Sequence, residues 1–179
     1  MTTHQGAAHR RRPFGGARTE EGFTLLELLI VVGIIGILIN IGLPTFFSAR
    51  QRTQNHAAQA ILRTALVAAN AAYVDFQDFG AVGQQDPKTA ADVLAGYETG
   101  PRFVATPSSA LNSIHVVAAY DDNDLGFIAM AAPAGDGLCW YAFQTNDGAP
   151  QYGESATAAD GTCDASVAGS VATYPEFPA

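Results

Sequence analysis

The residue types that usually carry enzyme chemistry are sparse in this chain of 179 residues. Its histidines, His4, His9, His56 and His115, do not sit in a zinc-ligand pattern, and the sequence contains neither a G-x-S-x-G motif nor a P-loop. Cys139 with His115 suggests at most a nucleophile with its base, and no surrounding motif supports that pair. We therefore expect no catalytic residue, no metal and no cofactor.

The acidic run Asp121–Asp124 is the strongest candidate for a cation site. An EF-hand loop beginning at Asp121 would have Leu125 at its fifth position and Ala132 at its twelfth, where the loop needs oxygen ligands. A solvated turn between two strands explains the run more simply, so we assign it no calcium.

The element that dominates the sequence is apolar and lies near the start. The 25 residues Phe23–Phe47 contain one charge, Glu27, and Leu28–Ile39 is an unbroken apolar run. About 20 mostly apolar residues span a bilayer as a helix, so the segment is long enough to cross a membrane. A buried core helix would need a larger domain around it. A secretory signal peptide would have a shorter apolar core followed by a small-residue cleavage site.

Charge on the two sides of this segment predicts its orientation. Residues 23–179 have five basic and fifteen acidic side chains, a net charge of -10, which also argues against a general nucleic-acid coat. Basic flanks stay in the cytoplasm, so we expect a single-pass helix with its N-terminus inside and its C-terminus outside. The preceding residues have a net charge of +2, from Arg10, Arg11, Arg12 and Arg18 against Glu20 and Glu21.

The boundary between leader and apolar segment carries a recognisable motif, Gly22-Phe23-Thr24-Leu25-Leu26-Glu27-Leu28-Leu29. It resembles the class III signal of type IV pilins and type II secretion pseudopilins. The resemblance is specific from residue 22 to about residue 50 and implies cleavage between Gly22 and Phe23. It also implies N-methylation of Phe23 and retention of the apolar helix.

Glu27 would then be the fifth residue of the processed chain. A carboxylate in the middle of a membrane helix costs about 2.5–3.5 kcal/mol, and this cost calls for a partner once helices pack together. The resemblance implies that the partner is the terminal amine on Phe23 of a neighbouring subunit, which would set the axial register of a filament. The alternative is a glutamate that snorkels to the membrane interface without a partner.

Glycines and a proline interrupt the same apolar segment. Glycine costs about 1 kcal/mol and proline about 3 kcal/mol inside a helix, so Gly36, Gly42 and Pro44 mark its weakest stretch. In related pilins this stretch can lose helical structure within the filament, which implies extensibility here. Close helix packing at the glycines and a simple kink at the proline are the alternative, and the two are compatible.

We expect an α+β, type IV pilin-like fold. Residues 1–22 would be a cytoplasmic leader, residues 23–76 one long helix whose part 23–47 spans the membrane, and residues 77–179 an extracytoplasmic β-domain. Three strands are predicted, Ser113–Tyr120, Leu125–Ala132 and Leu138–Gln144, forming an antiparallel meander against the helix. A break is expected at Gly80–Gly83, a short helix at Pro87–Ala95, and a loop-dominated tail from Thr145. The helix should face the sheet with a stripe at three- and four-residue spacing, Ala57, Ile61, Leu62, Ala65, Ala69, Ala72, Tyr73 and Phe76.

Two cysteines lie in this β-domain. Outside the cytoplasm a thiol pair usually oxidises, and a Cys139–Cys163 bond would resemble the carboxy-terminal disulfide loop of many pilins. On a chain-entropy estimate the loop is worth about 3–4 kcal/mol. Two unrelated buried thiols are the alternative.

The resemblance therefore predicts a structural subunit of a type IV pilus-like filament. It implies as partners other copies of the chain, the membrane before assembly, a prepilin peptidase, an inner-membrane platform protein and an assembly ATPase, and no direct contact with nucleic acid. The alternatives are a pseudopilin of a type II secretion or competence system, and an unprocessed, membrane-anchored binding module.

Overall fold

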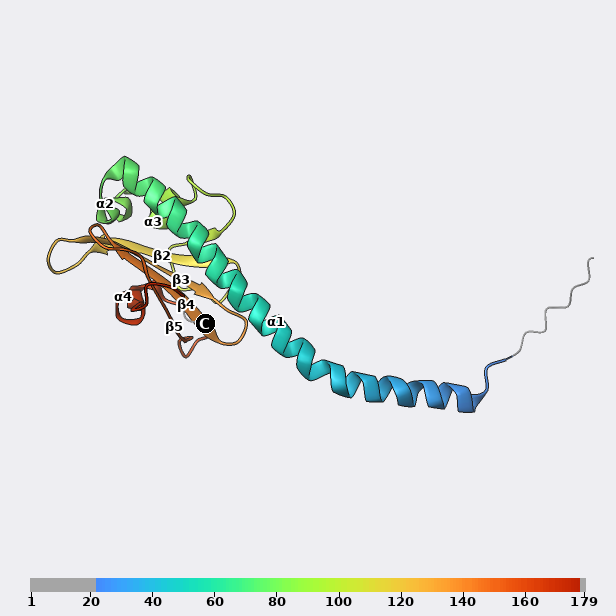
Figure 1. Cartoon of the computed structure of the whole chain (residues 1–179). Coiled ribbons are helices and arrows are strands. Elements are labelled where there is room, and N and C mark those ends of the chain that lie inside the picture. Colours follow the sequence, from blue (N-terminus) through green and yellow to red (C-terminus); the bar gives the residue numbers. More distant parts are fainter. Residues whose placement is uncertain (1–21, 178–179) are drawn as a thin grey trace, which may run out of the picture. The chain divides into compact units, whose positions relative to one another are not determined.

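The computed structural model describes residues 22–177 of the chain (Figure 1). The chain divides into two compact units, Met1–Gly42 and Leu43–Ala179. The predicted leader lies outside the described residues, apart from Gly22.

Helix α1, Leu25–Phe76, has 52 residues and continues through Pro44. In the first unit it consists of the apolar run, none of which is buried by the residues that the structure describes. By length and composition this part can cross a membrane. The prediction of one long helix ending at Phe76 is confirmed, and the helix begins two residues after Phe23.

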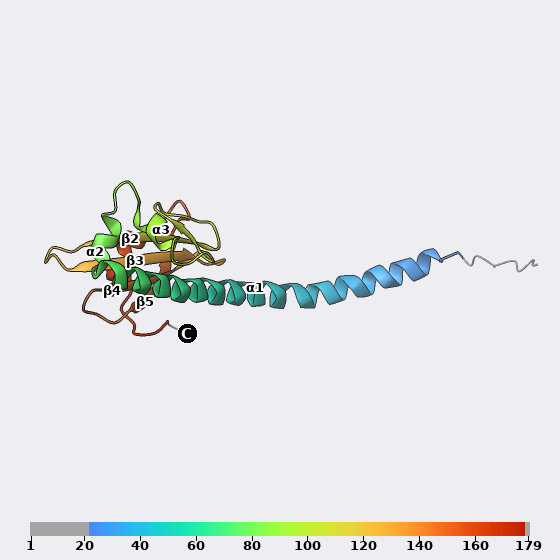
Figure 2. The same ribbon diagram turned by 90° about the horizontal axis from the view of Figure 1, so that it is seen from above.

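In the second unit α1 lies along a sheet (Figure 2). Its buried face is rich in alanine, which lets the helix backbone approach the strands closely. The predicted stripe has the right period but is slightly rotated, because Ala57 is exposed and Ile61 only half-buried. The buried residues of the helix are Ala58, Gln59, Leu62, Ala65, Leu66, Ala68, Ala69 and Ala72.

The sheet has five strands in the order β1-β2-β3-β4-β5. Strand β1 runs parallel to β2, and the other neighbouring pairs are antiparallel. The three predicted strands are confirmed to within one residue at their ends, and the α+β fold with them. Strands β1 and β5 were not predicted. The bounds are β1 Arg102–Val104, β2 Ser113–Tyr120, β3 Gly126–Pro133, β4 Leu138–Thr145 and β5 Gln151–Ala156.

Both faces of the sheet are covered. Because side chains alternate along a strand, Ile128 and Met130 of β3 point into the core with α1, whereas Ala129 and Ala131 point to the opposite face. That opposite face is covered by the 3₁₀ turn η1, Ala165–Val167, and helix α4, Ala168–Val171. The tail is mostly irregular, as predicted, but it also supplies an edge strand and this covering layer, which were not predicted.

A polar network holds the end of α1 to the sheet. The Asp78 carboxylate accepts hydrogen bonds from the Tyr120 hydroxyl (2.9 Å), the Asn146 side-chain amide (2.9 Å) and the Gly80 backbone N–H (2.8 Å). Asn146 in turn accepts from the backbone N–H of Phe79 (2.9 Å). The network joins three parts of the chain that are far apart in the sequence.

The same network corrects one sequence prediction. The expected break at Gly80–Gly83 is a short helix, α2 (Phe79–Gly83), with Asp78 as its N-cap. A side chain at Gly83 would collide with the Ala118 carbonyl oxygen, so α2 packs closely on β2 only because glycine stands there.

The second short helix also differs from its prediction. Instead of Pro87–Ala95, α3 covers Ala90–Leu94. It starts later because Thr89 and Asp92 form a reciprocal capping box: the Thr89 hydroxyl accepts from the Asp92 N–H (3.3 Å), and the Asp92 carboxylate accepts from the Thr89 N–H (2.9 Å).

We predict that Asp78→Ala lowers the free energy of unfolding by about 1–3 kcal/mol, because it leaves several half-buried donors unpaired. Burial alone would raise the pKa of Asp78, but the bonds from Asn146, Tyr120 and Gly80 outweigh burial and hold the pKa below its ordinary value. The contribution of Asp78 is therefore fully present above about pH 4 and is lost as the pH falls through the lowered pKa. Thermal unfolding of the full chain in detergent measures both effects. Asp86→Ala, which leaves the network intact, is the control.

Candidate functional site

The predicted processing and assembly residues begin the first unit. Thr24 precedes α1, and Glu27 is the acidic residue of its first turn. The Glu27 carboxylate oxygen Oε2 accepts hydrogen bonds from the backbone N–H and the hydroxyl of Thr24, both at 2.9 Å. The Thr24 hydroxyl accepts from the Glu27 N–H at 3.2 Å. The two residues thus form a capping box that starts the helix.

This capping box gives Glu27 a role within its own chain. The sequence analysis did not identify it, although Thr-x-x-Glu ahead of an apolar run is its ordinary signal. Both bonds from Thr24 to the carboxylate end on Oε2. Since a carboxylate has about four acceptor sites, Glu27 retains the capacity to accept a hydrogen bond from an amine of another chain.

The helix behind Glu27 presents an apolar surface that no part of residues 22–177 covers. Phe23 is 80% exposed and Ile41 is 70% exposed, and the large apolar residues between them are exposed as well. Added side chains at Gly33, Gly36 and Gly42 would meet nothing within 4 Å. So much apolar surface requires a lipid bilayer or other helices around it.

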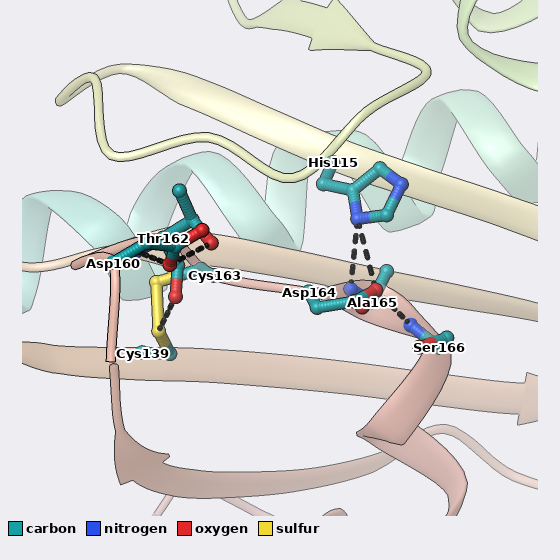
Figure 3. Close-up of polar contacts among 8 residues, drawn as sticks. All are labelled: His115, Cys139, Asp160, Thr162, Cys163, Asp164, Ala165 and Ser166. Carbon is teal, nitrogen blue, oxygen red and sulfur yellow. Dashed lines mark hydrogen bonds and ion pairs between the residues drawn. A yellow bond between two sulfur atoms is a disulfide. The ribbon is translucent and has the colours of Figure 1, made fainter. Parts of the chain in front are cut away.

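The C-terminal cysteines form the second predicted feature, and the structure joins Cys139 and Cys163 in a disulfide with their Cα atoms 5.5 Å apart (Figure 3). The expectation of a disulfide in the tail is confirmed. The bond attaches the tail to β4 at its first residues, and both cysteines are fully buried. Because the thiol of Cys139 is bonded, the pair Cys139 and His115 cannot act as nucleophile and base.

His115 instead anchors the tail (Figure 3). It lies on β2, is 4% exposed, and its Nδ1 accepts a hydrogen bond from the backbone N–H of Ala165 at 2.9 Å. The Asp164 carboxylate lies 3.4 Å from the same nitrogen and accepts from the Ser166 N–H, which caps η1. Since Nδ1 is an acceptor here, the imidazole is neutral.

We predict a pH-dependent stability from His115. Burial lowers its pKa, more than Asp164 and the Ala105 backbone raise it. The unfolded chain therefore binds a proton near pH 6.5 that the folded chain does not, and stability decreases as the pH falls from about 6.5 toward the lowered pKa. In His115→Asn, whose amide oxygen can still accept from Ala165, this part of the dependence should disappear. Unfolding of the full chain in detergent between pH 8 and pH 5 tests it, and an unchanged slope in the variant would contradict the assignment.

The acidic turn between β2 and β3 is exposed. The Asp121 carboxylate accepts from the backbone N–H groups of Asn123 and Leu125, both at 2.9 Å, and these bonds hold its pKa below the ordinary value. Asp121 therefore shapes the turn. Within residues 22–177, no three His, Cys, Asp or Glu side chains come together as metal ligands.

Comparison with known proteins identifies the family. Residues 17–39 match the family described as the prokaryotic N-terminal methylation motif. The chain is 30% identical over 116 residues to the type IV wide pilus major component PilA4 of Thermus thermophilus, a match that covers 63% of this chain and 82% of that protein. The chain belongs to the type IV pilin family.

A fimbrial protein of Pseudomonas aeruginosa is also similar to this pilin, with 37% identity over 71 residues. That match covers 40% of the chain and 45% of the relative. No solved structure matches the chain. The relatives are named as filament components, which agrees with the expectation that this pilin is a structural subunit and not an enzyme.

The pilin fold separates the predicted site residues into two groups. Gly22, Phe23 and Glu27 lie at the start of the first unit, whereas Cys139 and Cys163 lie in the second. Pro44 is helical, and its carbonyl oxygen accepts from the Ser48 hydroxyl at 3.1 Å. The sequence analysis missed Thr24 at the first group and the contact of His115 with Ala165 at the second.

Proposed function

We propose that this pilin is made as a precursor, inserted with its N-terminus in the cytoplasm, cleaved after Gly22, methylated at Phe23 and assembled into a type IV pilus-like filament. The observation that carries the proposal is the motif from Gly22 to Glu27 at the start of a helix whose apolar half is unburied. The match to the methylation motif supports it.

Cohesion of the filament comes from the apolar segment 23–47, which leaves the bilayer and packs against the same segment of other subunits. Glu27 pairs with the Phe23 amine of a neighbour and thereby disfavours wrong axial registers. The position of Glu27 in the first turn of α1 supports this role, because an acceptor there lies close to the new N-terminus of its own and of adjacent helices.

Each segment has its own task in this scheme. Residues 1–22 are the leader, residues 23–76 the helix that is first anchor and then filament core, and residues 77–179 the extracytoplasmic domain. Gly36, Gly42 and Pro44 allow the helix to extend under load, since they are its least stable stretch.

The remaining steps need other proteins. A prepilin peptidase removes the leader, and an inner-membrane platform protein and an assembly ATPase supply the work of extraction, because this sequence has no nucleotide-binding motif. We assign no nucleic-acid partner, since residues 23–179 have a net charge of -10.

Mass spectrometry of the N-terminal peptide from sheared extracellular material tests the proposal. We expect a peptide that starts at Phe23 and carries one extra methyl group. A chain found only in membranes, with residues 1–22 still attached, would contradict the proposal and indicate an anchored binding module.

A pseudopilin of a type II secretion or competence system is the second candidate. The C-terminal disulfide favours a pilus subunit, as does the similarity to a wide pilus major component over 82% of that protein. Glu27 favours a body subunit over a tip-initiating one and does not distinguish pilin from pseudopilin. Long, abundant surface filaments are expected for a pilus subunit, whereas short periplasmic assemblies would indicate the pseudopilin.

A further inference from the structure

The arginines of α1 all lie in the part of the helix before Asn70. Between Leu43 and Asn70 the helix contains Arg50, Arg52 and Arg63 and no aspartate or glutamate. Arg63 lies over the ring of Phe177, 4.8 Å from its centroid. Arg50 and Arg52 are exposed, and neither side chain has an ion pair or hydrogen bond within residues 22–177.

These two arginines mark one end of the globular unit. A few residues further along the helix, the Asn55 side-chain amide donates a hydrogen bond to the Asp136 carboxylate in the β3–β4 turn at 2.9 Å. This carboxylate is therefore bonded to Asn55 and forms no ion pair with either arginine. Arg50 lines a surface recess of about 410 Å³ together with Phe47, Leu111 and Gly135. Polar side chains, Gln51, Gln54 and Ser109, line the recess as well, and Arg50 is its one charged residue.

The opposite end of the unit is acidic. Asp78 at the end of α1 bonds Tyr120 and Asn146, so the β2–β3 and β4–β5 turns lie at this end. Arg50 and the last residue of α1 are about 39 Å apart along the helix. The exposed carboxylates of this end are Asp75, Asp121, Asp122, Asp124 and Asp147.

Within residues 22–177, no ion pair neutralises the charge of the carboxylates at this end. The last turn of α1 contains Asp75 and no basic residue, although the negative end of a helix dipole favours cations. The side chains of Asp122 and Asp124 have no hydrogen bond or ion pair with another described residue, although the Asp124 backbone N–H donates to the Asp121 carbonyl oxygen at 3.1 Å. They protrude at the tip of the β2–β3 turn.

We propose that the β2–β3 turn of one copy docks at the arginine end of the next, with Asp122 and Asp124 pairing with Arg50 and Arg52. The inference rests on the proposed function, because it names a contact between filament subunits. The two complementary surfaces lie at different places on one molecule, so the contact is head-to-tail and propagates into an open assembly instead of closing.

Phosphate headgroups of the membrane are the other partner that arginines beside an apolar helix can bind. A lipid contact would leave the carboxylates at the acidic end without a positively charged partner. A contact between copies explains both ends at once, and the charge complementarity favours it.

Charge reversal tests the contact in cells that assemble the wild-type chain. We expect Arg50→Glu/Arg52→Glu and Asp122→Lys/Asp124→Lys each to lower the yield of sheared filaments about tenfold or more, because each places like charges together. Combining all four substitutions should restore most of the yield. The matched controls, Lys88→Glu/Arg102→Glu and Glu154→Lys/Glu176→Lys, change the net charge equally at other places and should assemble normally.

A short bismaleimide reagent provides a second measurement on intact filaments. With Arg52→Cys and Asp122→Cys in one chain, we expect a ladder of covalent oligomers, which either substitution alone does not give. Formation of the Cys139–Cys163 disulfide and normal amounts of chain in the membrane verify that every variant folds.

Three results would overturn the inference. The first is normal assembly of both reversed variants, and the second is filaments that give no ladder. The third is an arginine reversal that reduces retention in the membrane while the aspartate reversal has no effect, which would assign Arg50 and Arg52 to lipid headgroups. If the wild-type chain itself formed no filaments, the proposed function would fail before the contact was in question.

Discussion

Glu27→Gln should abolish filament assembly while leaving the helix start intact. Glutamine can still accept from the Thr24 N–H and hydroxyl, the bonds that Glu27 makes at 2.9 Å, but it carries no charge for the amine of a neighbouring subunit. Removing one partner of a buried ion pair costs about 3–5 kcal/mol, which corresponds to more than about a hundredfold weaker subunit addition. The measurements are the yield of sheared filaments and the fraction of chain cleaved after Gly22.

Two further substitutions separate the charge from the cap. Thr24→Ala removes the cap and keeps the carboxylate, at a cost of about 1 kcal/mol to the helix start, so assembly should fall by less than about tenfold. Glu27→Ala removes both and should resemble Glu27→Gln. If Glu27→Gln assembled normally and Thr24→Ala did not, the glutamate would serve the helix start alone, and the register proposal would be wrong.

Features that depend on a repeated local pattern could be predicted from the sequence. The long helix follows from the apolar run and the spacing after it, and strands β2, β3 and β4 follow from apolar runs separated by turn residues. The motif from Gly22 to Glu27 could be recognised because it is contiguous.

Features that depend on distant partners could not be predicted in this way. Strand β1 has three residues and exists because it pairs with β2, and β5, with Gly153 in its middle, pairs with β4. The neutral state of His115 depends on Ala165, fifty residues away, and Asp78 depends on Tyr120 and Asn146. Nothing local in the sequence specifies these contacts, since they form only when the sheet brings the segments together.

Removing the disulfide should lower the free energy of unfolding by about 3–4 kcal/mol, a large part of the 5–15 kcal/mol of an ordinary domain. Cys139 and Cys163 are 24 residues apart, and opening this loop restores conformational entropy to the unfolded chain. We expect Cys139→Ala/Cys163→Ala to unfold at lower denaturant concentration than wild type when both are measured as full chains in detergent. Wild type treated with a reductant should match the variant.

The tail nevertheless has anchors besides the disulfide, and these decide how the variant behaves while folded. Ser108 and Cys163 exchange backbone hydrogen bonds, the Ala165 N–H bonds His115, and Ala165, Ala168 and Ala172 are buried against the sheet. Hydrogen exchange of the folded variant should therefore remain slow in η1 and α4, because the bond acts mainly through the unfolded chain. Fast exchange confined to residues 158–172 would show instead that the disulfide alone holds the tail on the sheet, and the loss of global stability would then be small.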